Sequence, residues 1–572
     1  MAGTLAEKPR IIGLAAAGLW RRLSRRLRTG PIARWRFAGL SPDRVLIAPP
    51  DLRMADAHVA QEFYSGRYAL AGKTVETGGL SPFQIMPPSA EWASGLHNFR
   101  WLRHMREAGT GLASVHARSL VTDWLRLHGR IIEGPTWDAD TVAKRVIAWL
   151  QHSGTLLRDC DLAFYRAFLK SLAFQLRYLK AVAKGLDQAE PRLRARIALV
   201  LAALSLPVSA ARLNAATRHL VHELERQILP DGTHLSRNPE SVLELLTDLL
   251  PLRQTFINQS KNPPAALVAA IERLLPALRF FRHRDGSLAR FNGAGFAMQE
   301  RIAAVLRFDD SAGTPLASAP HGGYQRLSMG SVTLIADTGA PPPVGASDDI
   351  HAGCLSFEFS SGRHSFVVNA GVDRFGPPEF RPLARTTAAH STATINDLSS
   401  CRFAEKGALS NLAGTPILSG PRRVPVKRQD TGHTQAFVSS HDGFVGSAGL
   451  LHEREITLSH GGSVISGRDK FVAPAGHPAR SGTAVQVAIR FHIHPKVHLV
   501  INAENQFELL ANRDDTWVFT CNDIAPHDEE SLFFAGISGP QKTRMIVLEF
   551  DASNVSEVTW QFTRTALGAW SR

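Results

Sequence analysis

The spacing of hydrophobic residues changes from a helical to a strand pattern a little past the middle of this 572-residue chain. Between about 90 and 283, apolar residues recur every three or four positions, as in the stripe from Leu162 to Leu179. Proline and glycine separate these stretches, for example at Pro191, Pro207 and Pro230–Gly232. Short amphipathic helices with brief connections and no strict repeat predict stacked helical hairpins, either in a solenoid or in an incomplete (α/α) toroid.

From about residue 320 onward, the chain has short apolar or alternating runs separated by turn residues. Val332–Ala336, Leu355–Phe359 and Val497–Asn502 have strand lengths, and Ser361–Gly362 is a turn signal between two such runs. No long helical pattern intervenes. The sequence therefore predicts an α+β multidomain protein, with a helical toroid domain over residues 41–310 and an antiparallel β-sandwich domain over residues 320–572.

Residues 1–40 form a third segment, which is basic. It holds nine lysines and arginines against Glu7, and so supplies +8 of the net charge of +14. The apolar run Ile11–Trp20 is too short to span a bilayer, and four arginines follow it where a cleavage site needs small residues. We therefore expect neither a cleavable signal peptide nor a transmembrane span, and interpret residues 9–28 as an amphipathic helix able to lie on an anionic membrane.

This arm predicts a place in the cell envelope or at the cytoplasmic face of a membrane. A solvated arm without a partner explains the same charges equally well. The remaining 532 residues carry only about +6, so the body of the protein lacks the basic surface typical of nucleic-acid binding, and we expect no nucleic-acid partner.

Several common enzyme classes are excluded by missing motifs. The chain has no GxxxxGK[ST], no GxGxxG opening a βα unit, no GxSxG and no HExxH. Its four cysteines form no CxxC pair, so a zinc ribbon or a dithiol redox site is not expected.

The most informative segment opens the predicted sandwich. Gly322-Gly323-Tyr324 leads into a strand, His351-Ala352-Gly353 precedes the next one, Asn369-Ala370-Gly371 ends another, and Ala389-His390-Ser391-Thr392 forms a turn. A histidine just before a strand is well placed for a cleft at the edge of a sandwich.

This order resembles the C-terminal domain of heparinase II/III-like proteins. In that family a Gly-Tyr strand precedes a His-Ala-Asp strand, an Asp-x-Gly strand end and an Ala-His-Asn-Thr turn. The resemblance covers roughly residues 320–500, including Glu455, Arg468–Phe471 and Phe491–Pro495, and the helical half fits the family's toroid. It implies cleavage of an acidic polysaccharide by β-elimination, which needs a group to neutralise the uronate carboxylate, a base for the C5 proton and an acid for the leaving oxygen.

Two acids of the family pattern are replaced here. Gly353 stands where the family has the aspartate of His-Ala-Asp, and Asn369 stands where it has the aspartate of Asp-x-Gly. Some members hold a structural zinc with these acids and the turn histidine. One remaining histidine cannot complete a tetrahedral site, so we expect no metal and no cofactor. The Tyr-His pair that members carry after the toroid proline is also replaced, by Ser241-Val242.

Four positions are candidates for the catalytic roles that the resemblance implies. His351 matches the sandwich histidine that acts as acid or base, although it could instead be a strand-cap histidine. Asn238 or Arg237 matches the carboxylate neutraliser, but Asn238 before Pro239 also has the features of a helix N-cap. Tyr324 is the tyrosine best placed to act as base. We expect substrate contacts from the following residues: His234, Glu240, Arg290, Asn292 and His390.

The resemblance therefore implies a lyase that cleaves an acidic, uronate-containing polysaccharide such as a glycosaminoglycan. The alternative is a non-catalytic glycan-binding protein of the cell envelope that descends from a lyase and has lost its base. Tryptophans of the helical half could line the toroid groove, although packing explains them as well: Trp92, Trp101, Trp137 and Trp149.

Overall fold

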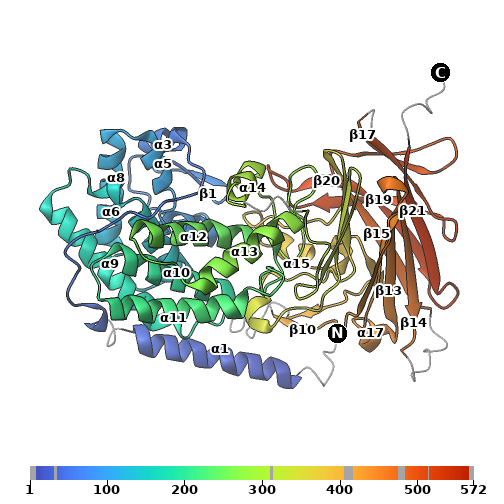
Figure 1. Ribbon diagram of the computed structural model, residues 1–572, viewed down its shortest axis with the longest axis horizontal. Helices are drawn as coiled ribbons and strands as arrows, with labels where there is room; N and C mark the ends of the chain where they lie inside the picture. Colours follow the sequence, from blue (N-terminus) through green and yellow to red (C-terminus); the bar gives the residue numbers. More distant parts are fainter. Residues whose placement is uncertain are drawn as a thin grey trace. The chain divides into compact units, whose positions relative to one another are not determined.

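A computed structural model describes residues 8–30, 35–309, 314–404, 416–474, 484–512 and 515–565 (Figure 1). The helices before the sandwich strands are α1 (Lys8–Thr29), α3 (Ala57–Tyr64), α4 (Ala90–His97), α5 (Leu102–Ala108), α6 (Gly111–Leu127), α7 (Ala139–Gln151), α8 (Ser153–Leu157), α9 (Leu162–Ala183), α10 (Ala189–Ser205), α11 (Ala210–Gln227), α12 (Pro239–Asn258), α13 (Ala265–Phe280) and α14 (Gln299–Leu306). Shorter turns of helix are η1 (Trp35–Phe37), η2 (Pro135–Trp137), η3 (Val344–Ala346), α15 (Phe380–Ala384), η4 (Thr387–Ala389), α17 (Val445–Ala448) and η5 (His460–Gly462).

The chain divides into two compact units. The sandwich unit takes in the described residues of Met1–Ala15, Leu229–Leu243 and Arg273–Arg572, and the helical unit those of Ala16–Ile228 and Glu244–Glu272. Helices in the first half and antiparallel strands in the second confirm the fold class that the sequence predicts.

The helical unit is built from helices that pack side by side. Helix α10 contacts α7, α9 and α11, as expected for successive hairpins. The four tryptophans that could have lined a groove, Trp92, Trp101, Trp137 and Trp149, are at most 2% exposed and form the core of this unit instead. One hairpin of strands, β1 (Arg67–Leu70) with β2 (Lys73–Glu76), interrupts the helices.

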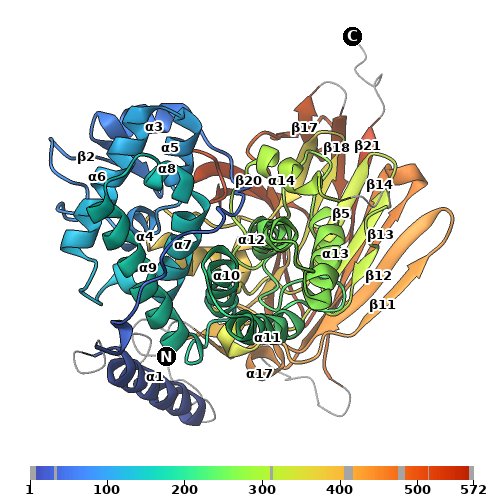
Figure 2. The same ribbon diagram turned by 60° about the vertical axis from the view of Figure 1, so that its left-hand side comes forward.

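Within the described residues, the sandwich unit holds two large antiparallel sheets (Figures 1 and 2). The eight-stranded sheet has the order β11 (Val426–Asp430), β12 (Thr434–His441), β13 (Leu451–Ser459), β14 (Val464–Val472), β21 (Glu557–Thr565), β18 (Asp515–Thr520), β17 (Phe507–Asn512), β16 (His498–Ile501). The nine-stranded sheet has the order β19 (His527–Phe533), β20 (Gln541–Asp551), β15 (Gln486–Ile493), β7 (His364–Val368), β6 (Phe357–Ser361), β5 (Val332–Asp337), β4 (Tyr324–Met329), β3 (Ser318–Ala319), and β8 (Ala393–Ile395) pairs with β15. A separate pair is β9 (Arg402–Phe403) with β10 (Ile417–Ser419).

Apolar and aromatic side chains from both sheets fill the space between them. The Phe357 ring of β6 stacks on the Trp560 ring of β21, with ring centroids 5.5 Å apart. Trp560 lies opposite Gly467 in the strand register, and a Cβ at Gly467 would be 2.0 Å from the indole ring. This glycine therefore makes room for the tryptophan that joins the two sheets.

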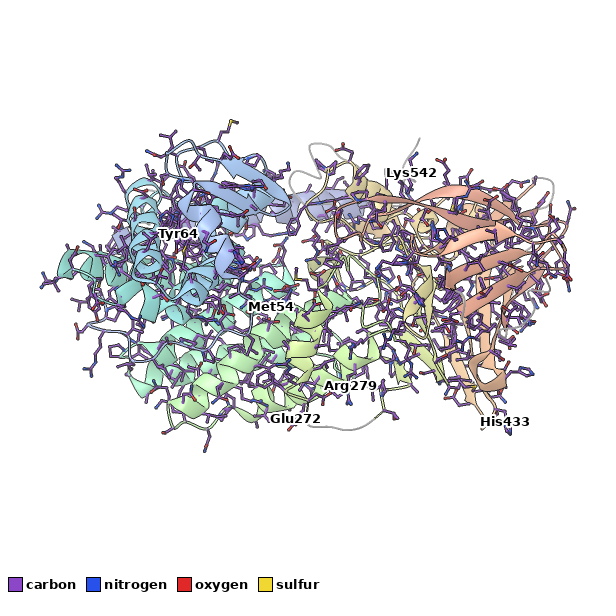
Figure 3. The ribbon with its side chains drawn as sticks, turned by 90° about the horizontal axis from the view of Figure 1, so that it is seen from above. Met54, Tyr64, Glu272, Arg279, His433 and Lys542 are labelled. Carbon is purple, nitrogen blue, oxygen red and sulfur yellow. The ribbon has the colours of Figure 1, made fainter. Side chains whose placement is uncertain are left out.

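His433, labelled in Figure 3, lies in the turn between β11 and β12, the outermost hairpin of the eight-stranded sheet. Among the described helices, no helix has both the length and the apolar character needed to cross a membrane. The longest arm helix, α1, is amphipathic, as the sequence predicts for residues 9–28.

Candidate functional site

A continuous chain of hydrogen bonds in the sandwich unit links five residues that the sequence singles out. They come from separate segments: Arg237 precedes α12, Asn292 follows α13, Tyr324 begins β4, His351 precedes β6, and His390 follows η4. All five side chains are buried, with exposed fractions of 6% or less. The fold therefore gathers residues up to 153 positions apart into one cluster.

The Arg237 side chain is held by hydrogen bonds to backbone carbonyls and by one ion pair. Its Nε donates to the carbonyl of Gly322 at 2.7 Å, and its terminal nitrogens donate to the carbonyls of Gly323, Gly339 and Ala340. It also forms an ion pair with Asp337. Burial opposes its charge but the Asp337 carboxylate outweighs that effect, so the pKa of Arg237 lies above its ordinary value. Because these bonds occupy the guanidinium donors, Arg237 anchors the loop before α12.

Tyr324 and Asn292 continue the chain. The Tyr324 hydroxyl donates to the carbonyl of Arg237, and the Asn292 Nδ2 donates to the Tyr324 oxygen at 2.7 Å and to Asp337 at 3.0 Å. Burial raises the pKa of the Tyr324 phenol. The backbone NH of His351 donates to Asn292 Oδ1 at 3.3 Å. Tyr324 and Asn292 therefore place the segment that carries His351.

The two histidines at the end of the chain contact one another directly. His351 Nδ1 lies 3.1 Å from His390 Nε2, and His390 Nδ1 lies 2.7 Å from the carbonyl oxygen of Thr386. A carbonyl only accepts, so His390 Nδ1 carries a hydrogen. Burial lowers the pKa of His390 to about 4, which keeps its ring neutral at pH 7 and makes Nε2 an acceptor. His351 Nδ1 must then donate to it.

This arrangement fixes the tautomer of His351. Burial, reinforced by His390, Arg385 and Arg374, holds the pKa of His351 well below its ordinary value. The neutral ring has one hydrogen, which sits on Nδ1, so its Nε2 carries a lone pair. Chemically, His351 can accept a proton at Nε2 in the resting protein but has none to give from that atom.

Asn238 and Glu240 open α12 beside this cluster. The Asn238 Oδ1 accepts from the backbone NH of Glu240 at 2.9 Å, which is the N-cap geometry, and Pro239 takes the first helical position. Glu240 accepts from the NH of Gly295 and lies 3.5 Å from Arg374. Arg374 is 37% exposed in its side chain, and its charge acts on His351. No sequence motif marks Arg374, because it lies in an irregular loop outside the segments that carry the family resemblance.

Two predicted substrate-binding residues lie in other surroundings. His234 is buried and its Nδ1 contacts the Ser236 hydroxyl at 2.8 Å. The Arg290 side chain lies 3.8 Å from Glu358, whose carboxylate also contacts His283 at 3.1 Å. Burial opposes the charge of Glu358, but His283 and Arg290 outweigh it and its pKa is lowered. Glu358 is a buried acid on β6 that the sequence pattern did not mark.

These residues do not fit the zinc site that some members of the heparinase II/III-like family have. A Cβ added at Gly353 would be 2.7 Å from the His390 ring, so that ring occupies the space where an acidic side chain would stand. The Asn369 Oδ1 accepts from the NH of Ser391, and an amide is a poor replacement for a carboxylate ligand. The donor set therefore consists of two mutually bonded histidines without an acid.

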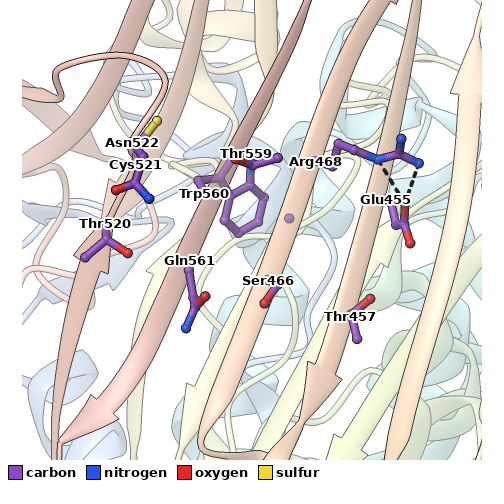
Figure 4. Close-up of a pocket in the computed structure, with 11 residues that line it drawn as sticks. Glu455, Thr457, Ser466, Arg468, Thr520, Cys521, Asn522, Thr559, Trp560 and Gln561 are labelled. Atoms are coloured by element: carbon purple, nitrogen blue, oxygen red, sulfur yellow. Dashed lines mark hydrogen bonds and ion pairs between the residues drawn. The ribbon is translucent and has the colours of Figure 1, made fainter.

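A separate hollow of about 300 Å³ lies on the eight-stranded sheet (Figure 4). It is lined by polar side chains of β13, β14, β18 and β21 and crossed by an ion pair in which Arg468 contacts Glu455 at 2.6 Å. Figure 4 shows the Trp560 indole beside this hollow, and its Nε1 donates to Asp469 at 2.8 Å. None of the predicted site residues lines it.

Comparisons with known proteins place relatives of this chain in one family. The model of the family described as Heparinase II/III-like, C-terminal matches residues 311–561. FtsZ-localized protein C of Caulobacter vibrioides is 31% identical over 592 residues, which cover 98% of this chain and 100% of that protein.

Solved structures show the same fold at low identity. Heparinase III superposes with a TM-score of 0.71 at 14% identity, over 92% of this chain and 88% of that one. The heparan sulfate lyase HepC from Pedobacter heparinus superposes with a TM-score of 0.61 at 15% identity, over 99% of this chain and 92% of that one. The helical half thus has the toroid fold, followed by the antiparallel sandwich.

Proposed function

The chain belongs to the heparinase II/III-like family, and on this premise we propose that it cleaves an acidic, uronate-containing polysaccharide by β-elimination, with His351 as the base. The observation that carries the proposal is the bonded pair of His351 and His390, which leaves the His351 Nε2 with a lone pair. β-Elimination begins by removing the C5 proton of the uronate, and a neutral histidine with a lone pair on Nε2 is able to accept it.

The proton on C5 becomes acidic only when the adjacent carboxylate is neutralised. Asn238 remains a candidate for that role, with its N-cap bond as the competing explanation. Arg374 is an additional candidate, because its side chain is partly exposed and its charge acts on His351. Once the proton has moved to His351, the same imidazolium can protonate the departing glycosidic oxygen, so one residue serves both steps.

The other predicted site residues take supporting roles in this proposal. Arg237 and Tyr324 act as positioning residues, because their polar groups are bound to backbone carbonyls and to Asp337. Asn292 orients His351 through the backbone NH, and His390 sets its tautomer. The remaining substrate contacts are assigned to His234, Glu240 and Arg290, and Glu240 lies 3.5 Å from Arg374.

The second candidate function is glycan binding without catalysis. The loss of the family's Tyr-His pair at Ser241 and Val242 favours it, because Val242 is buried and has no polar group. The low exposure of His351, 5%, favours it as well, because a base must reach its substrate. In this alternative the protein keeps the lyase fold and binds an envelope polysaccharide.

The two candidates are separated by the ultraviolet absorbance of the product. A lyase leaves a C4–C5 double bond that absorbs in the near ultraviolet, so each uronate polymer in a panel is incubated with the full chain and followed spectroscopically. Product formation that disappears in the His351→Ala variant supports the lyase. Binding of a polymer without any absorbing product would replace it with the glycan-binding alternative.

We also propose that α1 holds the protein at an anionic membrane. Its exposed apolar residues, Ile12, Leu19, Trp20, Leu23 and Leu27, recur at helical spacing and form one stripe, with Arg22 and Arg26 exposed beside it. The name of the Caulobacter relative connects that protein with FtsZ, which supports a location at the cell envelope near sites of division. A fluorescent fusion of the full chain, compared with one starting at residue 41, tests this location.

A further inference from the structure

Three side chains able to bind a metal lie together at one edge of the nine-stranded sheet, apart from the candidate site. His527 and Glu529 come from β19, which is the edge strand, and Glu549 comes from the neighbouring strand β20. One ligand atom from each of the three lies within 4.8 Å of the others. Such a group joins an imidazole with two carboxylates rather than being a cluster of acids alone.

The strand register explains why these three side chains meet. His527 pairs with Val547 and Glu529 with Met545, so Glu549 is the next residue beyond Val547 on the same face of the sheet. That face is opposite to the sandwich core, because the alternate residues of β20, Ile546 and Leu548, belong to the core cluster. The two strands thus present their ligands to one side, away from the core.

In the described part of the chain, the two carboxylates of the cluster form no ion pair with a lysine or an arginine. His527 Nε2 lies 3.4 Å from Glu529 Oε1. The adjacent acid on β19, Asp528, differs because it forms an ion pair with Arg544. Two facing carboxylates repel one another, and a divalent cation between them removes that repulsion.

We propose that His527, Glu529 and Glu549 form a binding site for a divalent transition-metal ion of the zinc class. Imidazole nitrogen and carboxylate oxygen bind zinc at about 2.0–2.2 Å, which places neighbouring ligands of a tetrahedral ion roughly 3.4 Å apart. His527 and Glu529 keep 43% and 41% of their side chains exposed, so they can rotate to close the present spacing. Three protein ligands leave the fourth position to water, and the ion ties the edge strand β19 to β20.

The site is independent of the proposed lyase activity, and its test is metal binding by the full chain. The chain is freed of any polyhistidine tag, treated with chelator and dialysed against Zn²⁺, and the bound metal is measured by elemental analysis. Co²⁺ is used in parallel, because its visible absorption reports nitrogen and oxygen ligands. We expect one ion per chain, and at least a tenfold weaker affinity in His527→Ala and in Glu549→Gln.

The matched control is Glu530→Gln, which removes an exposed carboxylate from the same strand but from the opposite face. It should bind zinc as the unmodified chain does, and zinc should raise the thermal unfolding midpoint of both but not of Glu549→Gln. Circular dichroism confirms that each variant is folded, and Glu549→Gln preserves the side-chain shape. No bound ion in the unmodified chain, or equal binding by His527→Ala and Glu549→Gln, would overturn the proposal.

Discussion

The His351 and His390 imidazoles share one hydrogen bond, 3.1 Å long, whose direction is set by the carbonyl of Thr386. Because that carbonyl takes the hydrogen of His390 Nδ1, the lone pair of His390 Nε2 must face His351. The hydrogen of the neutral His351 ring therefore sits on Nδ1, and its lone pair is on Nε2. The contact between two neutral histidines thus selects one tautomer of His351. The family pattern has acids beside the turn histidine instead.

Replacing His351 by alanine should abolish β-elimination if the proposed function holds. A general base contributes about 10²–10⁴-fold to the rate, so His351→Ala should lower kcat by that factor. The assay is product absorbance with the best polymer of the uronate panel. His390→Gln should give a smaller loss with a changed pH profile, because it acts only through His351. Full activity in His351→Ala would show that the base lies elsewhere.

Asn238→Ala and Arg237→Ala separate binding roles from structural ones. Arg237 is a buried partner of Asp337, so its removal leaves an uncompensated carboxylate and should destabilise the protein by about 3–5 kcal/mol. If Asn238 acts only as the N-cap, changing it to alanine should lower the free energy of unfolding by about 1 kcal/mol and leave turnover intact. If Asn238 instead neutralises the substrate carboxylate, the Asn238→Ala substitution should lower kcat more than it raises KM. Thermal unfolding and steady-state kinetics of both variants distinguish these outcomes.

Zinc should not bind at the turn histidine. The His390 ring fills the space beside Gly353, and the Asn369 side chain bonds to the NH of Ser391, so no acid is available as a ligand. We expect the zinc content of the purified chain to be the same in the His390→Gln variant, whereas it should fall in His527→Ala if the edge site binds zinc. A loss of tightly bound zinc on changing His390 alone would contradict this prediction.

The broad architecture was predictable because it rests on local periodicity. Steps of three and four residues gave the helices, and alternation with turn residues gave the strands. The β1–β2 hairpin was not predicted, because its strands have four residues each and its second strand, Lys73–Glu76, is mostly polar. Its turn, Ala71 and Gly72, uses positive φ at both positions, which a lone alanine does not signal.

The candidate site was predictable only in part. His351 and His390 were found through the family motif, but their mutual bond depends on a fold that brings together segments 39 positions apart. Asp337, which binds both Arg237 and Asn292, and the buried Glu358 have no sequence signal, because each looks like one more polar residue of a strand. Partners of buried charges are set by three-dimensional packing, and local patterns do not encode them.

Acidic pH should destabilise the sandwich unit. Burial lowers the pKa of His390 to about 4 and that of His492 to about 3, while both are near 6.5 in an unfolded chain. The unfolded chain therefore binds more protons below pH 6.5, and the free energy of unfolding falls as the pH drops from about 6.5 toward 4. Each such histidine contributes about 1 kcal/mol per pH unit in that window.

Thermal unfolding followed at pH 7.5, 6.0 and 5.0 measures this dependence. The His390→Gln variant, which cannot titrate at that position, should show a shallower decline of its midpoint than the unmodified chain. Stability that is flat between pH 7.5 and 5.0 would mean that these histidines are not held neutral by the fold. Burial would raise the pKa of the Asp285 carboxyl, but His283 and hydrogen bonds outweigh burial and lower it to about 2. Carboxylates of this kind therefore affect the stability only at lower pH.

Binding of α1 to membranes should depend on both its charge and its apolar stripe. Each arginine near an anionic surface contributes on the order of 1 kcal/mol, and this attraction is screened by salt. We therefore expect the full chain to bind vesicles containing anionic lipid, and to bind less at high ionic strength. A chain starting at residue 41 should lose this binding.

A more specific variant tests the stripe itself. Trp20 is 68% exposed and lies between Leu19 and Leu23, so its ring is available to enter the interface between headgroups and acyl chains. Trp20→Ser should weaken vesicle binding several-fold without changing the helix charge, and the fluorescence of Trp20 should shift to shorter wavelength on binding in the unmodified chain. The control is Arg21→Gln, because Arg21 pairs with Asp187 at 2.5 Å and is less exposed, so it should reduce binding less than Arg22→Gln. If the truncated chain binds as well as the full one, another surface is responsible and the α1 assignment fails.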